Sequence, residues 1–235
     1  MLSVRALRAN YGQIPILVGI DFELADGEFL GILGHNGMGK TTLLRTLVGH
    51  LRATGGSIAL DGRDITRLPT HERALRGIGL VPQGREIFAN LTVHENLRMG
   101  MAGAAKEKHS IIDELLVEFP RLKPLLDRRG GALSGGEQQL LAIARCLCGK
   151  PSLVLLDEPT EGIQPSIIEE IIETLLRIKQ SHRISIILVE QNLEFISSLS
   201  DRVLTIQKGR ITGEIAGEAL TDNDTMAQYA GAAML

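Results

Sequence analysis

Residues 34–42, Gly-His-Asn-Gly-Met-Gly-Lys-Thr-Thr, match the full pattern G-x-x-x-x-G-K-[ST]. A short apolar run at 29–33 precedes this loop, and leucines at helical spacing follow it as far as Gly49. Glycines in such a loop let backbone N–H groups converge on phosphate oxygens, and the start of the following helix adds a favourable field. A glycine-rich turn with an exposed lysine is the alternative, but it does not require this spacing. The pattern therefore predicts a nucleotide phosphate held between a strand and a helix.

Two side chains of the loop have predicted roles of their own. Lys40 is expected to reach the β- and γ-phosphates, and the Thr41 hydroxyl is expected to help hold Mg²⁺. The predicted nucleotide-binding residues of the loop are Gly34, Asn36, Gly37, Gly39, Lys40, Thr41 and Thr42.

The rest of the chain changes between strand and helix patterns. Strands are predicted at 4–8, 16–24, 29–33, 57–60, 78–81, 153–156, 184–189 and 203–206, a helix at 166–179, and only helices at 92–149. Strands that alternate with helices predict a mostly parallel sheet covered on both faces, whereas the two N-terminal strands alternate like antiparallel ones. We therefore expect an α/β core at about 1–83 and 150–217 that starts with an antiparallel β subdomain, an inserted α-helical subdomain at about 84–149, and a tail at 218–235.

Composition excludes several classes of protein. The 235 residues are 44% hydrophobic and 23% charged, which is ordinary for a globular domain. Few aromatic residues (3%) and a net charge of -3 argue against nucleic-acid binding. No apolar run has the length of a transmembrane helix, and residues 1–10 lack the apolar centre of a signal peptide. Cys146 and Cys148 point to different faces of a predicted helix, so unpaired thiols in a reducing cytosol are favoured over a disulfide or a metal site.

Two acidic residues end a second apolar strand. Asp157 follows the run Leu-Val-Leu-Leu, at the position where phosphate-loop enzymes hold their magnesium. Glu158 comes next and can orient or deprotonate an attacking water. Two solvated acids in a turn before Pro159 are the alternative, which the phosphate loop makes less favourable. We predict that Asp157 is a metal ligand and Glu158 a catalytic base.

Two further residues are candidates because of their places in the chain. Gln83 follows the strand at 78–81, and its amide can bind the metal or a water at the border with the helical insertion. Tyr11 is expected in a loop between the first two strands, where its ring can stack on adenine. An ordinary core or surface tyrosine is almost equally compatible with the sequence.

A second glycine pair opens a helix of its own. Ser134 can cap the helix predicted at 137–149, and the amides of Gly135 and Gly136 are then free for an anion. A capped helix after a glycine turn is the alternative. Because the chain then has two phosphate-binding elements, we expect each chain to offer one half-site to its own nucleotide and the other to a partner's nucleotide.

Together and in this order, these motifs resemble the nucleotide-binding subunits of ABC transporters over essentially residues 2–215. In that family two ATPase domains face each other head to tail. The resemblance implies that ATP and Mg²⁺ are bound between the phosphate loop of one chain and the Leu-Ser-Gly-Gly-Glu signature of the other, which Ser134, Gly135 and Gly136 supply in trans. It also implies that Gln83 contacts the membrane subunit, that Asp157 and Glu158 are the second Walker motif and the catalytic carboxylate, and that Tyr11 stacks on adenine.

Two stretches, 81–88 and 157–166, look like the branched-chain amino acid and amide uptake group, and within it most like the second ATPase subunit of urea importers. Two positions depart from the wider family. Gln191 stands where most members have a histidine that touches the γ-phosphate, and a glutamine amide donates a hydrogen bond but carries no charge. Gln164 stands where an aspartate usually communicates between the two sites. Gln191 is accordingly a candidate catalytic residue, in a site that is either slowed or adapted.

The resemblance implies an ATPase subunit of an importer for urea or branched-chain amino acids. Its expected partners are a second ATPase subunit in a homo- or heterodimer, transmembrane permease subunits, and indirectly a periplasmic solute-binding protein. Its expected place is the cytoplasmic face of the inner membrane, with the permease docked near residues 84–103. There Phe88, Leu91 and Val93 either offer apolar contacts to the permease or pack inside the chain, and the sequence does not favour one of these two alternatives. One alternative is an ATP clamp with a degenerate site in a heterodimer. The other is a soluble ABC ATPase without a transport role.

Overall fold

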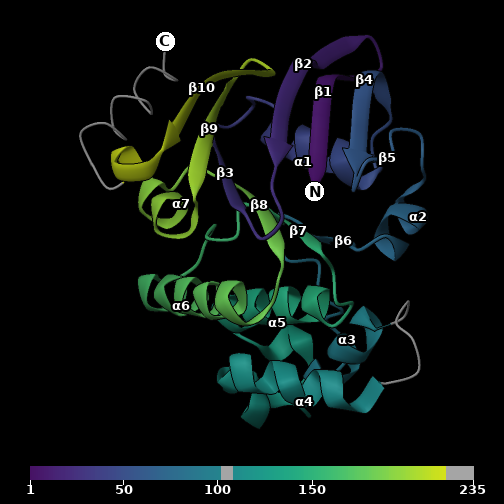
Figure 1. Cartoon of the computed structure of the whole chain (residues 1–235). Coiled ribbons are helices and arrows are strands. Elements are labelled where there is room, and N and C mark those ends of the chain that lie inside the picture. Colours follow the sequence, from purple (N-terminus) through teal and green to yellow (C-terminus); the bar gives the residue numbers. More distant parts are fainter. Residues whose placement is uncertain (102–107, 221–235) are drawn as a thin grey trace.

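The computed structural model describes residues 1–101 and 108–220, which form two β-sheets and the helices around them (Figure 1). The first sheet has the order β2-β1-β4-β5 and is antiparallel. The second has the order β10-β9-β3-β8-β7-β6 and is parallel except for the edge pair β10–β9. The strands are β1 Leu2–Tyr11, β2 Ile14–Leu24, β3 Phe29–Leu33, β4 Ala53–Leu60, β5 Arg63–Asp64, β6 Ile78–Val81, β7 Leu153–Asp157, β8 Ser185–Glu190, β9 Arg202–Gln207 and β10 Arg210–Ala216. The predicted α/β fold, with its mostly parallel sheet and N-terminal antiparallel strands, is confirmed.

The central strands of the parallel sheet are buried along their whole length. Every residue of β3, β7 and β8 is buried, as expected for strands covered on both faces. Leu33 lies opposite Glu190, and Asp157 lies opposite Val189. Because parallel strands end at the same edge of a sheet, the segments that follow β3, β7 and β8 emerge side by side.

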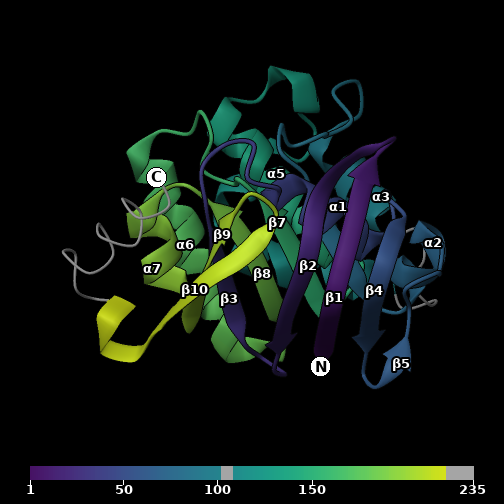
Figure 2. The same cartoon turned by 90° about the horizontal axis from the view of Figure 1, so that it is seen from above.

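Helices cover both faces of this sheet (Figures 1 and 2). They are α1 Lys40–Val48, α2 Thr70–Leu75, α3 Val93–Gly100, α4 Lys108–Glu118, α5 Gly135–Leu147, α6 Pro165–Ser181 and α7 Leu193–Leu199, with short 3-10 turns at Pro120–Leu125, Gly130–Ala132 and Gly217–Leu220. The apolar side chains of α1 join one core with strands of both sheets. The other core lies under α5, α6 and α7 and extends into α3 and α4. Helices α3, α4 and α5 all lie between β6 and β7 in the chain.

Several local features differ from the sequence expectations. Helices α2 and α7, with 6 and 7 residues, were not predicted because they are too short for a helical period to stand out, and β10 was not predicted because only Ile215 in this strand is buried. Tyr11 is not in a loop, because it ends β1 and pairs with Ile14 across a tight turn that Gly12 enters with φ 59. Most of the predicted tail at 218–235 lies outside the described residues.

Three smaller expectations can be compared with the structure. The Ser134 hydroxyl accepts a hydrogen bond from the Glu137 N–H at 3.3 Å, and the Glu137 carboxylate accepts one from the Ser134 N–H at 2.7 Å, so the predicted cap is part of a capping box. Cys146 and Cys148 are free thiols, and burial raises the pKa of each to about 12. Within the described ranges, no helix is both long and apolar enough to span a membrane.

Candidate active site

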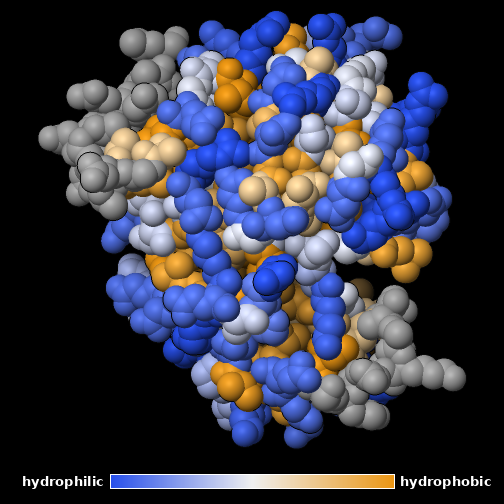
Figure 3. All heavy atoms as spheres, viewed as in Figure 1, coloured by the Kyte–Doolittle hydropathy of each residue, from blue (hydrophilic) through white to orange (hydrophobic). Residues whose placement is uncertain are grey.

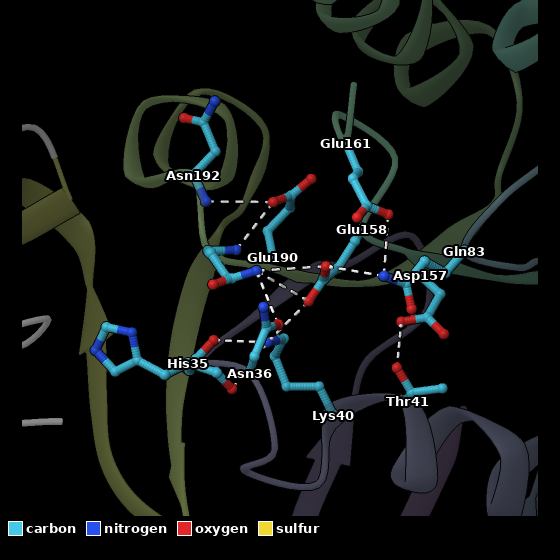
Figure 4. Close-up of polar contacts among 12 residues, drawn as sticks. His35, Asn36, Lys40, Thr41, Gln83, Asp157, Glu158, Glu161, Glu190 and Asn192 are labelled. Carbon is cyan, nitrogen blue, oxygen red and sulfur yellow. Dashed lines mark hydrogen bonds and ion pairs between the residues drawn. The ribbon is translucent and has the colours of Figure 1, made fainter. Parts of the chain in front are cut away.

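Segments from four strand ends meet at the carboxyl edge of the parallel sheet (Figure 4). They are the loop at 34–42 after β3, residues 157–161 at and after the end of β7, residues 190–192 at the end of β8, and Gln83 after β6. The loop at 34–42, Asp157 and Glu158 were predicted from separate motifs. The parallel register brings them together.

The loop after β3 leaves the start of α1 open. Gly39 is the N-cap of α1 with φ 106, and no side chain caps the helix. Glycine adopts this left-handed conformation without steric cost, so the chain turns into the helix and its first N–H groups keep no side-chain acceptor. At Gly34 a Cβ atom would lie 2.7 Å from the carbonyl oxygen of Ile206, so glycine is needed there for close packing. This geometry suits a phosphate anion.

Lys40 forms a buried ion pair with Glu158. The Lys40 Nζ lies 2.9 Å from Glu158 Oε1, and the two side chains are 3% and 7% exposed. The same ammonium donates hydrogen bonds to the carbonyl oxygens of Gly34 at 2.7 Å and His35 at 3.1 Å. All these partners are oxygen atoms, so phosphate oxygens can take their place. Lys40 is therefore held beside the carboxylate that is the candidate base.

Glu158 has an unusual backbone conformation. Its φ is 46, in the left-handed region, which costs free energy for a residue with a Cβ. Its N–H donates to the carbonyl oxygen of Val189 at 3.0 Å. Strained residues of this kind persist where surrounding contacts hold them, and they concentrate at functional sites.

Asp157 and Thr41 form the second close pair. The Thr41 hydroxyl donates to Asp157 Oδ1 at 3.0 Å, and Asp157 is 4% exposed. The pKa of the Asp157 carboxyl is raised to about 6, chiefly by burial and also by the Glu158 charge, whereas the Thr41 hydrogen bond and the Lys40 charge lower it. Hydroxyl and carboxylate oxygens are ligands that Mg²⁺ prefers, and a cation would relieve the cost of burying the charge. Both residues therefore fit a Mg²⁺ ion that accompanies the nucleotide.

The raised pKa of Asp157 predicts how stability depends on pH without nucleotide. Between pH 3.8 and about 6 the folded protein binds more protons at this carboxyl than the unfolded chain does, so the free energy of unfolding falls as the pH rises through this range and stays lower above it. We expect Asp157→Asn to unfold at the same temperature as the wild type near pH 4. At pH 7 we expect a higher unfolding temperature for the variant, because its free energy of unfolding exceeds that of the wild type by up to about 3 kcal/mol. Thermal unfolding at both pH values measures this, and an equal or less stable variant at pH 7 contradicts it.

Gln83 lies beside the acids of the site. Its Nε2 donates to Glu161 Oε2 at 3.0 Å and is 3.4 Å from Glu158 Oε2. The amide oxygen is the atom that binds a metal, so the predicted metal role needs that oxygen to turn toward Asp157. Gln83 therefore lies next to the candidate site, as the sequence predicted, and its role as a metal ligand stays a prediction.

Gln191 joins the phosphate loop to Glu158. Its Nε2 donates to Asn36 Oδ1 at 3.0 Å and lies 3.4 Å from both carboxylate oxygens of Glu158. An amide donor here can contact a terminal phosphate or an attacking water. Unlike a histidine side chain, the glutamine amide carries no positive charge and cannot transfer a proton.

Tyr11 lies at the edge of the site. Its side chain is 43% exposed, and its hydroxyl oxygen is 3.5 Å from Nη1 of Arg45. A shallow pocket brings Tyr11 together with Gln83 and Asp157. Stacking on adenine is compatible with this exposure and stays a prediction.

The signature residues do not line the pocket that the loop at 34–42 forms with Gln83 and Glu158. In the described part of the chain, Ser134, Gly135 and Gly136 also make no hydrogen bond to the residues of that pocket. A Cβ on Gly136 would lie 2.8 Å from Ile167, so the start of α5 packs closely on α6. The guanidinium of Arg85 lies beside Gly135 and is 3.3 Å from Gln138 Oε1. This separation within one chain is compatible with a half-site that serves a partner.

Sequence reasoning missed Glu190 and Asn192. Glu190 is 3% exposed and its carboxylate binds both the loop after Glu158 and the backbone of Gln191. Asn192 caps α7, with its side chain accepting from the Phe195 N–H. A usable signal was present, because Glu190 ends an all-buried parallel strand as Asp157 does.

The described surface has one groove near the predicted docking region. It runs between α2 and the segments around α3 and α5, and hydrophobic residues gather at this notch in Figure 3. Leu75, Phe88 and Met99 line it and are 71%, 44% and 47% exposed. Val93, by contrast, is fully buried, so of the two alternatives for this residue the internal packing holds and the contact with a partner does not.

Comparisons with known proteins agree with this geometry. Residues 17–161 match the family model described as ABC transporter. The chain is 41% identical over 224 residues to the high-affinity branched-chain amino acid transport ATP-binding protein BraG of Pseudomonas aeruginosa, covering 95% of this chain and 96% of that protein. It is 37% identical to a probable branched-chain amino acid transport ATP-binding protein, LivF, of Archaeoglobus fulgidus, covering 90% of each.

Solved structures share the fold over nearly the whole chain. MJ1267, an ATP-binding cassette of an ABC transporter in its ADP conformation, superposes with a TM-score of 0.83 at 28% identity, covering 98% of each chain. A nucleotide-free ATP-binding cassette from an ABC transporter superposes with a TM-score of 0.84 at 26% identity, covering 97% of this chain and 98% of that one.

Proposed function

The chain belongs to the ABC transporter family as an ATP-binding, ATP-hydrolysing subunit, and we propose that it drives the uptake of branched-chain amino acids with Glu158 as its catalytic base. One observation carries the assignment of the base. Glu158 is in contact with Lys40 and within 3.4 Å of the Gln191 amide, in a strained backbone conformation at the end of a buried strand.

The proposed reaction follows from the chemistry of these side chains. Terminal phosphate oxygens replace the partners of Lys40, which frees the Glu158 carboxylate to accept a proton from the attacking water. Lys40 and the N–H groups at the start of α1 stabilise the negative charge on the phosphate, and Gln191 donates a neutral hydrogen bond. Thr41, Asp157 and, with its amide turned, Gln83 would hold Mg²⁺, which neutralises charge on the phosphates when it is bound.

The solute is proposed from the relatives. The proteins from Pseudomonas aeruginosa and Archaeoglobus fulgidus are named as branched-chain amino acid transport subunits, which supports that solute class for this chain. Urea, which the sequence stretches at 81–88 and 157–166 suggested, is the alternative solute.

Partners are proposed from the separate half-sites and the groove. Two ATPase subunits, identical or different, would place the signature at Ser134, Gly135 and Gly136 of one chain against the phosphate loop of the other. A helix of a transmembrane permease would dock in the groove beside Phe88, and a periplasmic binding protein would deliver the solute to the permease. The chain would then lie on the cytoplasmic face of the inner membrane.

A transport assay tests the proposed solute. We expect that deleting the gene in its source organism abolishes high-affinity uptake of radiolabelled leucine, and that the wild-type gene restores it whereas a Glu158→Gln copy does not. Loss of urea uptake with normal leucine uptake would assign urea instead. Unchanged uptake of both solutes would contradict the transport role proposed for this chain.

The ATP clamp is a second candidate because of one observation. Gln191, a neutral side chain, occupies the position between Asn36 and Glu158. If the missing positive charge weakens hydrolysis, the chain's own pocket holds ATP without hydrolysing it. A partner's composite site, completed by this chain's signature, then hydrolyses ATP. Lys40→Ala in this chain alone separates the two candidates.

A further inference from the structure

Glu190 is a buried carboxylate bound on both sides by the active-site segments. Its Oε1 accepts hydrogen bonds from the Thr160 N–H at 3.0 Å and the Thr160 hydroxyl at 2.7 Å. Its Oε2 accepts from the N–H groups of Gln191 at 2.9 Å and Asn192 at 3.2 Å. Glu190 is only 3% exposed, and among residues 1–101 and 108–220 no cationic side chain forms an ion pair with it.

Burying a carboxylate without a cation is costly unless donors satisfy it. Here donors from two separate segments do so, and three of them are backbone N–H groups that cannot move independently of the chain. Such charge-assisted hydrogen bonds are short and directional, so they fix the relative position of the segments that they join.

The segments that Glu190 joins carry the two side chains that meet at the reaction centre. Thr160 is two residues after Glu158, and Gln191 is the next residue after Glu190. The strained backbone of Glu158 is thus held by β8 at two points, directly through the carbonyl oxygen of Val189 and through Thr160 on Glu190. The Gln191 amide that lies 3.4 Å from the Glu158 carboxylate has its backbone fixed by the same Glu190 side chain.

We propose that Glu190 is a positioning residue for ATP hydrolysis, which fixes Glu158 and Gln191 relative to each other without touching the nucleotide. This inference rests on the role of Glu158 proposed above. A general base works only when it lies within hydrogen-bond reach of its water, so a small displacement of the loop after Glu158 lowers the rate of hydrolysis more than it lowers ATP binding.

The test is Glu190→Gln, which keeps the size of the side chain but turns its acceptor on one side into an N–H₂ donor. That donor then faces either the Thr160 donors or the N–H groups of Gln191 and Asn192. We expect kcat for ATP hydrolysis to fall on the order of 10- to 100-fold, with the Kd of a fluorescent ATP analogue changed less than about threefold. Glu194→Gln makes the same change at an exposed position on α7 and is expected to leave both values at the wild-type level.

A second pair of variants keeps the carboxylate in place and guards against a folding defect in Glu190→Gln. Thr160→Val removes the hydroxyl donor to Glu190, whereas Thr160→Ser keeps it, so kcat is expected to fall in the first variant and to be preserved in the second. Equal kcat in the valine and serine variants, or losses of ATP affinity as large as those of kcat, overturn the positioning role.

Glu158→Gln distinguishes failure of this inference from failure of the proposed base. If Glu158→Gln loses hydrolysis and Glu190→Gln does not, only the positioning role is wrong. If Glu158→Gln turns over ATP at the wild-type rate, the base assignment is wrong and the positioning role falls with it. If both roles are right, the double variant Glu158→Gln with Glu190→Gln is expected to hydrolyse ATP no more slowly than Glu158→Gln alone, because the two residues act on one step.

Discussion

We expect Glu158→Gln to lower the kcat for ATP hydrolysis on the order of 10²- to 10⁴-fold while ATP still binds. The amide keeps the size of the carboxylate and can still accept a hydrogen bond from Lys40, but it cannot accept a proton from water. Because the nucleotide contacts of the phosphate loop are unchanged, the ATP-bound state is expected to accumulate. If the signature is supplied in trans as proposed, that state would be a dimer closed around ATP.

Steady-state hydrolysis, a binding titration and size-exclusion chromatography with ATP and Mg²⁺ together check this result. Glu173→Gln is the matched control, because it removes one carboxylate from an exposed position on α6. Wild-type turnover in Glu158→Gln would show that another group activates the water. Loss of ATP binding along with hydrolysis would instead show that the ion pair with Lys40 is needed to keep the pocket formed.

The sequence predicted which segments meet at the candidate site better than it predicted the contacts between their side chains. That Lys40, Thr41 and Asp157 lie together could be predicted because short motifs follow buried strands, and parallel strands bring their carboxyl ends to one edge. Ser134 was found because capping is a local interaction within one turn of helix. In each case the physical cause is local or is a property of the sheet as a whole.

Contacts between distant segments could not be predicted in the same way. The hydrogen bonds between Gln191 and Asn36 and between Thr160 and Glu190 join residues far apart in the chain, and no spacing in the sequence encodes them. The direction of the Gln83 amide depends on Glu161, which no motif singled out. Exposure is equally non-local, because Phe88 and Val93 belong to the same predicted docking segment, whereas only Phe88 reaches the groove.

We expect Lys40→Ala to weaken nucleotide binding and to lower the stability of the folded state. A hydrogen bond to a charged group contributes about 1.5–3 kcal/mol, so we expect ATP to bind roughly 10- to 100-fold more weakly. The change also leaves Glu158 buried without its cation. Removing one partner of a buried ion pair costs about 3–5 kcal/mol, and the Gln83 and Gln191 amides near Glu158 offset part of this cost.

A double variant separates these two effects. In Lys40→Ala with Glu158→Gln the uncompensated charge is absent, so the melting temperature is expected to rise above that of Lys40→Ala alone, while ATP binding stays weak. Thermal unfolding without nucleotide measures the first quantity, and titration with ATP measures the second. A double variant no more stable than the single one would mean that the lost stability comes from the lysine side chain itself and not from the buried carboxylate.

Lys40→Ala also decides between an active site and an ATP clamp in a heterodimer. When only this chain carries the change and the ATP concentration is kept below the weakened Kd, its own pocket is mostly empty. The partner's pocket keeps its phosphate loop and, in the proposed dimer, still receives Ser134, Gly135 and Gly136 in trans. We expect single-turnover hydrolysis to be lost entirely if this chain's pocket takes part in catalysis. Near-normal turnover would support the clamp, because the signature at the start of α5 would then be this chain's contribution to hydrolysis, made at the partner's site.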